Sequence, residues 1–162
     1  MSPEGRGTRP TTERVREAIF NSLGSAGLID GARVLDLWAG TGALGIEALS
    51  RGAERCVFVE RDRTAIGVLR DNVRTLGLES RSTVVAGDAL AAAAGPADII
   101  VADPPYGDAP WAELLQRVTA DLVVTEGDRA VEGEGWEQWR ARRYGRTWVT
   151  FLRRTTGEPT AM

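Results

Sequence analysis

The tetrad Asp103-Pro104-Pro105-Tyr106 is the most specific chemical signal in this sequence of 162 residues. It directly follows an apolar run, residues 99–102, that is typical of a buried strand. Because proline fixes φ and lacks an N–H group, the two prolines make the turn stiff and leave its carbonyl groups free to accept hydrogen bonds. Asp103 and the Pro104 carbonyl are acceptors suited to an amino group, and the ring of Tyr106 offers a flat face for stacking a base.

These four residues therefore predict a catalytic site for the exocyclic amino group of a nucleic-acid base. Such a nitrogen is a poor nucleophile because its lone pair is delocalised into the ring. Acceptors that bind both N–H protons favour a pyramidal nitrogen and direct the lone pair toward a sulfonium methyl group, while stacking holds the base in line. No metal ion is needed. A plain Asp-Pro turn is the alternative interpretation.

A glycine-rich loop lies upstream, after the apolar run at residues 33–37. Gly40 and Gly42 let the backbone turn sharply and let a ligand approach without a Cβ in the way. Glu60 ends the next apolar run, where an acid can accept hydrogen bonds from both ribose hydroxyls of an adenosine. The predicted cofactor-binding residues here are Asp36, Ala39, Gly40, Gly42, Glu60 and Arg61, with Asp103 from the tetrad.

The spacing Gly40-x-Gly42-x-x-Gly45 also matches the dinucleotide fingerprint, so a nicotinamide dehydrogenase is a competing interpretation. Asp36 argues against it. A carboxylate beside a pyrophosphate is repelled, whereas beside the amino group of a methionine moiety it is attracted. The chain also looks too short for a domain that binds a hydride acceptor. S-adenosyl-L-methionine is therefore the expected cofactor.

Apolar runs alternate with helical patterns along the chain, which predicts βαβ units and a doubly wound, mostly parallel α/β sheet of the Rossmann-like class. Strands are expected at 33–37, 55–59, 83–86, 97–102 and 122–125, and helices at 12–23, capped by Thr12, and at 43–51, 62–76 and 111–119. Residues 139–143 and 147–153 predict an antiparallel C-terminal hairpin. Residues 1–10 are expected to form a flexible arm, and residues 11–156 a single domain.

Composition excludes several classes of function. The sequence has no histidine and a single cysteine, which excludes Ser-His-Asp hydrolysis, histidine-ligated metal sites and a disulfide framework. The net charge is −3, yet every basic residue is arginine and six arginines lie between Arg140 and Arg154 with no acidic residue among them. Because the distribution of charge matters more than its sum, we expect RNA contacts from Arg6, Arg9, Arg142 and Arg143. An ordinary solvated surface is the alternative.

The chain resembles the RsmD-type family of 16S ribosomal RNA guanine-N2 methyltransferases. The resemblance lies in residues 9–17, in the glycine loop and following helix at 36–52, in Val59-Glu60 and in the tetrad. It implies a class I methyltransferase in which Thr11 and Thr12 border the cofactor, and Asp88 and Ala89 contact its adenine. On the sequence alone, Asp88 is instead a helix N-cap.

The resemblance further implies methylation of N2 of a guanine in 16S rRNA, within an assembled 30S particle. We expect a monomer, and a cytoplasmic protein because residues 1–6 contain no apolar segment typical of a signal peptide. No apolar stretch is long enough to span a bilayer, so no membrane is expected. A DNA adenine-N6 methyltransferase stays open as an alternative, because adenine-N6 and cytosine-N4 enzymes share the tetrad. The second alternative is a relative of these enzymes that binds the cofactor but does not transfer the methyl group.

Overall fold

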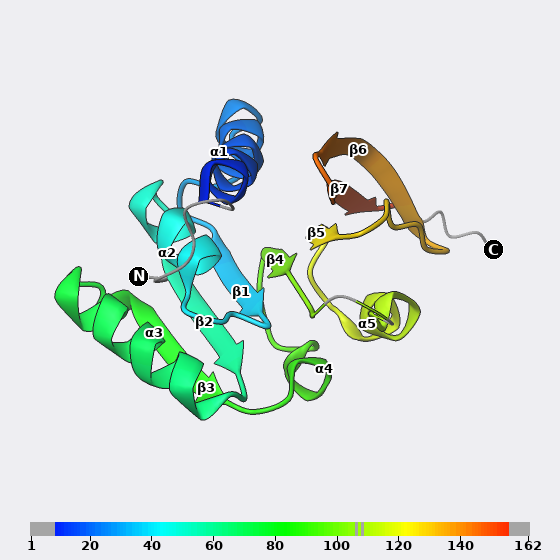
Figure 1. The fold of residues 1–162 in the computed structure, drawn as a ribbon. Coiled ribbons are helices and arrows are strands. Elements are labelled where there is room, and N and C mark those ends of the chain that lie inside the picture. The colour runs from blue at the N-terminus through cyan, green and yellow to red at the C-terminus, as the bar shows by residue number, and fades with distance from the viewer. Residues whose placement is uncertain (1–8, 106, 108, 156–162) are drawn as a thin grey trace.

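The computed structural model describes residues 9–105, 107 and 109–155, with the side chains of residues 9–11 outside the description. Its centre is a seven-stranded sheet in the order β3-β2-β1-β4-β5-β7-β6, with helices on both faces (Figure 1). The elements in chain order are α1 (Arg9–Ser25), β1 (Arg33–Leu37), α2 (Ala43–Ser50), β2 (Arg55–Glu60), α3 (Arg63–Thr75), the 3₁₀ turn η2 (Glu79–Arg81), β3 (Ser82–Ala86), α4 (Ala89–Ala92), β4 (Ile99–Ala102), α5 (Trp111–Arg117), β5 (Leu122–Gly127), β6 (Trp136–Tyr144) and β7 (Thr147–Arg154).

The first five strands are parallel, and β7 runs antiparallel to both β5 and β6. The predicted fold class, a doubly wound and mostly parallel sheet with an antiparallel C-terminal hairpin, is confirmed. Because parallel strands all end at the same edge, the residues that follow β1, β2 and β4 come together there. The turn between β6 and β7 lies at that edge too, since β7 starts beside the end of β5.

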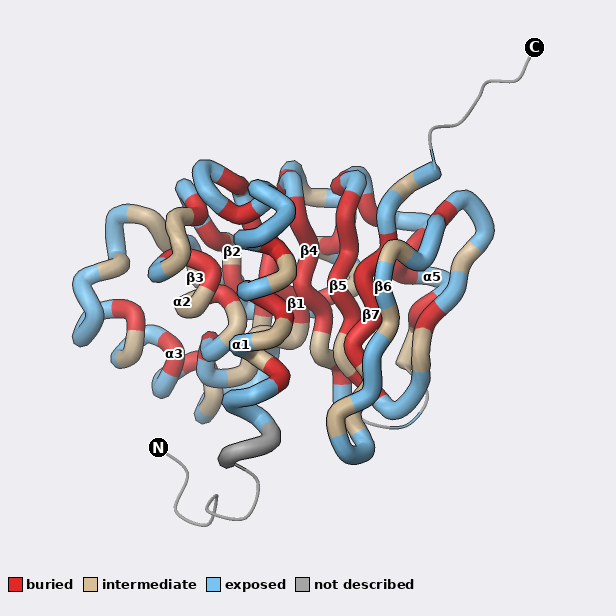
Figure 2. Tube along the Cα trace, turned by 90° about the horizontal axis from the view of Figure 1, so that it is seen from above, coloured by how far each residue is buried: buried red, intermediate tan, exposed pale blue. Residues whose placement is uncertain are grey.

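Two apolar layers pack against the sheet and hold it in place. On one face α1, α2 and α3 contribute side chains such as Phe20 and Leu69, which meet Phe58 of β2. On the other face α4 and α5 cover β4 and β5, with Leu114 fully buried. The central strands are buried on both sides (Figure 2), which is why they appear in the sequence as continuous apolar runs rather than as alternating ones.

The start of the first helix differs from its prediction. α1 begins at Arg9, so Thr12 lies inside the helix and the prediction that it is the N-cap is wrong. The last two residues of the predicted arm, Arg9 and Pro10, belong to this helix. Proline is well accommodated in a first helical turn, where its missing N–H group would have no partner.

The caps of two other helices are confirmed. Asp62 caps α3 by accepting a hydrogen bond from the Ala65 N–H group at 2.9 Å. Asp88 caps the short helix α4 by accepting one from the Ala91 N–H group at 3.0 Å. Within the described residues, no helix combines the length and the apolar character needed to cross a membrane.

Candidate active site

A pocket of about 460 Å³ opens beyond the carboxyl ends of β1 and β4. The order of the strands reverses between these two, and such a switch point is where open α/β sheets bind ligands. The glycine loop forms one wall, and the start of the Asp-Pro-Pro turn forms the other. The lining residues are Asp36, Trp38, Ala39, Gly40, Thr41, Ala43, Leu44, Asp103, Pro104 and Pro105.

The glycine loop has the backbone that its sequence predicts. Gly40 has φ of 59° and Gly42 has φ of 94°, both in the left-handed region where a side chain is strained. A Cβ on Gly42 would also lie 2.3 Å from the Leu69 side chain. Trp38 is the one non-glycine residue of the described chain with a positive φ, 57°. The loop therefore bends sharply over the pocket and leaves its backbone open to a ligand.

Gly45 serves a different purpose, which is close packing of α2 on the sheet. A Cβ there would lie 2.4 Å from the Phe58 ring and 2.9 Å from Oδ2 of Asp36. The same approach lets the Gly45 N–H group donate a hydrogen bond of 2.9 Å to Asp36 Oδ2. The third glycine of the fingerprint thus positions an acid of the site.

Asp36 is almost fully buried, with 1% of its surface exposed. Burial raises the pKa of its carboxyl group to about 8, the hydrogen bond from Gly45 opposes this effect, and the nearby Asp103 and Glu60 carboxylates raise the pKa further. Among the residues that the structure describes, the charge of this carboxyl group therefore has no counterion, which is the electrostatic environment that a cationic ligand fits.

Glu60 holds the glycine loop in place. Its Oε1 accepts a hydrogen bond of 2.8 Å from the Gly40 N–H group, and its Oε2 accepts one of 2.9 Å from the Asp62 N–H group. A carboxylate can accept about four hydrogen bonds, so each oxygen keeps an acceptor position for a ligand. Glu60 lies at the end of β2, beside the pocket rather than in its lining.

Asp103 and Pro104 face the pocket as the tetrad predicts. Burial raises the pKa of the Asp103 carboxyl group to about 6. Pro104 is buried and Pro105 is exposed, while Tyr106 lies outside the described residues. The pocket therefore unites the glycine loop with the first three residues of the tetrad, and the stacking role of Tyr106 stays a prediction.

The other predicted cofactor residues lie outside the lining of this pocket. Arg61 and Asp88 are exposed and form an ion pair of 3.7 Å between the ends of β2 and β3. Ala89 is buried in the apolar layer under α4. Thr12 is exposed on α1, and the side chain of Thr11 is outside the description. Their contacts with a cofactor stay predictions.

Two residues that the motifs did not single out belong to the site. Trp38 lines the pocket and packs against the apolar layer under α4. Glu126, near the end of β5, is largely buried, and its pKa is raised to about 8 by burial and then by the charges of Asp103 and Asp36. The signal for Glu126 is an acid at or next to the carboxyl end of an apolar strand, a position that Asp36, Glu60 and Asp103 share on β1, β2 and β4.

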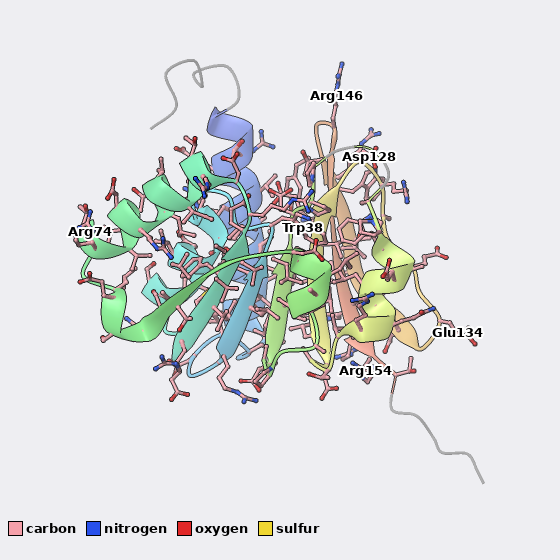
Figure 3. All side chains as sticks on the ribbon, turned by 90° about the horizontal axis from the view of Figure 1, so that it is seen from below. Trp38, Arg74, Asp128, Glu134, Arg146 and Arg154 are labelled. Atoms are coloured by element: carbon pink, nitrogen blue, oxygen red, sulfur yellow. The ribbon has the colours of Figure 1, made fainter. Side chains whose placement is uncertain are left out.

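The C-terminal arginines divide into two groups. Arg142 and Arg143 are exposed on β6, and Arg146 marks the turn of the hairpin, where it points away from the molecule (Figure 3). In contrast, Arg153 lies over the Trp139 ring and pairs with Glu137 at 3.7 Å. Arg142, Arg143 and Arg146 thus lie toward the end of the sheet where the pocket opens.

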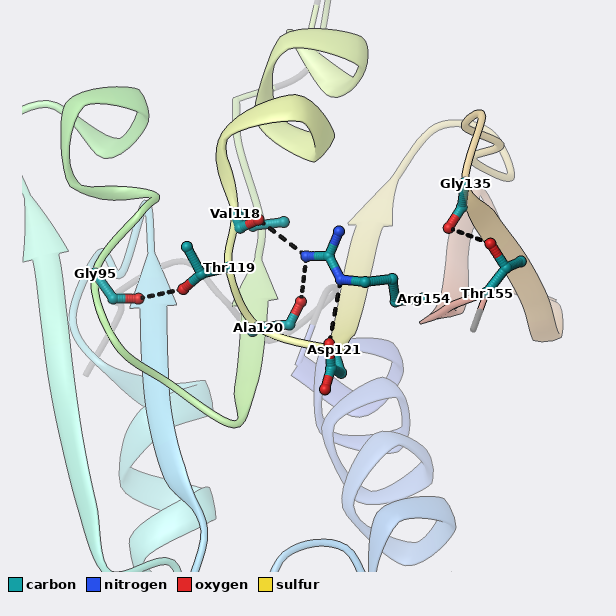
Figure 4. Close-up of polar contacts among 8 residues, drawn as sticks. All are labelled: Gly95, Val118, Thr119, Ala120, Asp121, Gly135, Arg154 and Thr155. Atoms are coloured by element: carbon teal, nitrogen blue, oxygen red, sulfur yellow. Dashed lines mark hydrogen bonds and ion pairs between the residues drawn. The ribbon is translucent and has the colours of Figure 1, made fainter. Parts of the chain in front are cut away.

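Arg154 is a structural residue at the opposite end. Its guanidinium group donates hydrogen bonds to the carbonyl groups of Val118 and Ala120, at 2.9 and 2.8 Å, and to Asp121 at 3.1 Å (Figure 4). It also lies 4.5 Å from the centre of the Trp136 ring. The run of six arginines is therefore not one continuous basic surface. Arg6 lies outside the described residues, as does the side chain of Arg9.

Comparison with known proteins identifies the family. A family model described as "Conserved hypothetical protein 95" matches residues 1–153. The chain belongs to this family. Its resemblance to the RsmD-type enzymes is confirmed by two relatives. The chain is 45% identical over 141 residues to the "Putative rRNA methyltransferase YlbH" of Bacillus subtilis, covering 79% of this chain and 76% of that one.

The second relative is the "Ribosomal RNA small subunit methyltransferase D" of Escherichia coli, 44% identical over 107 residues that cover 64% of this chain. The match spans 52% of that relative, about half its length. A solved structure, the "Putative methyltransferase yhhF" of Escherichia coli, superposes with a TM-score of 0.79 at 34% identity and covers 90% of this chain and 86% of that one. The chain and this solved structure thus share one fold.

Proposed function

We propose that this protein transfers a methyl group from S-adenosyl-L-methionine to the exocyclic N2 amino group of a guanine in 16S ribosomal RNA. The observation that carries the proposal is the meeting of Asp103 and Pro104 with the glycine loop in one pocket, at the switch point of the sheet. The names of the two relatives, both rRNA methyltransferases, support RNA as the substrate.

The acids Asp36 and Asp103 of the pocket lining, together with Glu126 on the neighbouring strand, fit this cofactor. Asp36, Asp103 and Glu126 are acids with raised pKa values, and within the described residues none of the three has an ion pair. A ligand that carries positive charge relieves the cost of burying them. When bound, S-adenosyl-L-methionine supplies a methyl group on a positively charged sulfur. The bare backbone at Gly40 and Gly42 gives such a ligand room to approach.

Each side chain has a distinct part in this proposal. Glu60 accepts hydrogen bonds from the two ribose hydroxyls through the acceptor positions that the loop leaves free. Asp36 attracts the amino group of the methionine moiety. Asp103 and the Pro104 carbonyl accept the two N–H protons of the target amino group, and Tyr106 stacks on the base. The rate is gained by positioning and by electrostatic stabilisation.

The substrate side of the proposal rests on the β6–β7 hairpin. Arg142, Arg143 and Arg146 lie at or toward the edge of the sheet where the pocket opens, so they can contact phosphates while a base enters it. Arg6 and Arg9 are proposed to add contacts from the N-terminal side. We further propose that the protein acts as a monomer on the assembled 30S particle.

The test is methyl transfer from labelled S-adenosyl-L-methionine to naked 16S rRNA, to 30S particles and to duplex DNA, followed by identification of the modified nucleoside. We expect N2-methylguanosine in RNA. Replacement of Asp103 by Ala is expected to lower kcat by roughly 100-fold or more, comparable with the loss of one oxyanion-hole donor.

Cofactor binding to Asp103→Ala should survive, because Glu60 and the glycine loop remain. Glu137→Ala, on the exposed face of β6, is the matched control and should keep full activity. N6-methyladenine in DNA as the product would replace the proposal by its alternative. Cofactor binding without any methyl transfer would indicate a relative without turnover.

A further inference from the structure

Glu126 lies beside Asp103 at the edge of the sheet where the pocket opens. In the parallel pairing of β4 with β5, Ala102 is opposite Thr125, so the next residue on each strand is Asp103 and Glu126. The ladder continues past the end of β4, because the Asp103 N–H group donates a hydrogen bond of 3.4 Å to the Leu37 carbonyl of β1. Adjacent strands lie about 4.8 Å apart, which brings the two carboxyl groups within reach of each other.

The two side chains also share one face of the sheet. Val101 and Val124 pack in the layer under α1 to α3, and side chains two residues apart on a strand point the same way. Asp103 and Glu126 therefore project toward the face that Asp36 occupies, two residues beyond Val34 of the same layer. The charges of both Asp103 and Asp36 act on Glu126, which agrees with this placement.

Within the described residues, the charges that act on Glu126 are those of Asp103 and Asp36, and nearby arginines are engaged elsewhere or separated from Glu126. On α1, Arg16 pairs with Glu47 of α2 at 3.6 Å. On β6, Arg140 donates a hydrogen bond of 3.0 Å to Ser22. Arg142 is opposite Val149 of β7, and Val149 in turn is opposite Glu126, so an apolar residue lies between them. Two adjacent buried carboxyl groups that have no counterion among the described residues do not both ionise at neutral pH, where they hold one proton between them.

We propose that Glu126 is a positioning residue for the transfer reaction: its protonated carboxyl group donates a hydrogen bond to the Asp103 carboxylate and holds it in the orientation that accepts the target N–H group. The inference rests on the proposed function. In the transfer, the amino lone pair forms the new N–C bond and the electron pair of the S–C bond stays on sulfur. The nitrogen then releases one proton to the Asp103 carboxylate, from which it passes to water.

This arrangement makes the ionisation of the pair a two-step process. The pKa values near 6 for Asp103 and near 8 for Glu126 place the singly ionised pair around neutral pH. Below this range Asp103 is protonated and accepts poorly. Above it Glu126 loses the proton that it donates, and the two carboxylates repel each other. Activity is therefore expected to rise and then fall across this range.

The first test is independent of methyl transfer and follows the carboxyl carbon of Asp103 by NMR as a function of pH. In the intact protein its resonance should show two inflections, because the later ionisation of Glu126 changes its surroundings. Glu126→Gln keeps a neutral donor and should remove the inflection that Glu126 causes, while an inflection from the nearby Asp36, whose pKa is also about 8, remains. Glu137→Gln removes an exposed carboxyl group and should leave both. An Asp103 titration that is identical in the intact protein and in Glu126→Gln overturns the proposal, whatever the enzyme does.

The second test measures steady-state methyl transfer from pH 5.5 to 9. Loss of a hydrogen bond to a charged group predicts that Glu126→Ala lowers kcat by about 10- to 100-fold at neutral pH. KM for RNA and the Kd of the cofactor should change less than about twofold. Glu126→Gln should recover most of kcat and keep its activity at high pH.

The outcomes of the second test separate the two proposals. A Glu126→Gln enzyme as inactive as Glu126→Ala, with intact cofactor binding, excludes a neutral donor and overturns the positioning role. Absence of transfer by the unaltered enzyme refutes the proposed function instead. The NMR titration would then test only whether Asp103 and Glu126 share a proton.

Discussion

At the scale of single residues, the carboxyl group of Glu60 has a structural role and a proposed role in ligand binding. The sequence motif alone does not distinguish the two. It fixes the glycine loop through the N–H groups of Gly40 and Asp62, and it keeps acceptor positions for ribose hydroxyls. The first role is seen in the structure, and the second belongs to the proposal. A carboxylate is suited to both because its two oxygens accept in different directions.

Replacement of Glu60 by Ala is expected to weaken cofactor binding by about 1–3 kcal/mol, the cost of leaving polar groups without a charged acceptor. Isothermal titration calorimetry with S-adenosyl-L-methionine measures this loss, and Trp38, which lines the pocket, provides a second readout by its fluorescence. Glu54→Ala, exposed just before β2, is the matched control. Equal affinity in the Glu60 and Glu54 variants would contradict the assignment.

At the scale of elements, local sequence patterns predicted the positions of most helices and strands. The expected strand at 33–37 coincides with β1, and α3 begins after the predicted Asp62 cap, because continuous apolar runs and cap residues are local signals. β6 begins at Trp136, three residues earlier than expected. A register shift between Gln138 and Arg140 interrupts the alternation there, so the pattern along the sequence did not show the start of the strand.

The candidate site was predictable to the extent that it is local in sequence. The glycine loop and the tetrad each form a short motif, so Asp36, Gly40 and Asp103 were found directly. Glu126 meets Asp103 only through the pairing of β4 with β5, and a register between strands cannot be derived from the residues of either strand alone. The separation of Arg154 from the exposed arginines likewise depends on its hydrogen bonds to the loop before β5.

The β6–β7 hairpin leads to a prediction about RNA. Replacement of Arg142 and Arg143 together by Gln should weaken RNA binding across sequences. The slope of log K against log salt should become shallower by about 0.7–0.9 for each phosphate that the protein no longer neutralises. Filter binding or fluorescence anisotropy at several salt concentrations measures the slope. Cofactor affinity should be unchanged.

The control removes the same charge from the later part of α3, which packs on β3 and β2 on the side of the sheet opposite β6, by replacing the exposed Arg70 and Arg74 with Gln. This control should keep the slope of the intact protein. A slope that is unaltered in the Arg142 and Arg143 variant would return these residues to the ordinary solvated surface.

At the scale of the whole molecule, the buried acids make the stability of the free protein depend on pH. An unfolded carboxyl group ionises near pH 4, whereas Asp36 in the folded state ionises near pH 8. The unfolded chain therefore gives up protons first as the pH rises, and folding stability falls between about pH 4 and pH 8. Glu126 and Asp103 have raised pKa values as well and act in the same direction.

The melting temperature of the free protein is thus expected to fall by at least about 5 °C between pH 5 and pH 8.5, measured by calorimetry or circular dichroism. Asp36→Asn removes the acid with the largest burial and should flatten this dependence. S-adenosyl-L-methionine should flatten it too, because a positively charged ligand favours the ionised acids. A melting temperature that rises steadily over this range would contradict the raised pKa values.

The outer position of β6 has a consequence for the behaviour of the protein in concentrated solution. In the part of the chain that the structure describes, this strand pairs with β7 alone and forms an open edge of the sheet, where unpaired backbone groups are a template for edge-to-edge aggregation. Arg140, Arg142 and Arg143 place like charges along that edge, and two such edges repel each other. These arginines thus keep the protein soluble, in addition to any contact that they make with RNA. Without their charge, the backbone of β6 could pair with the β6 of a second copy of the chain.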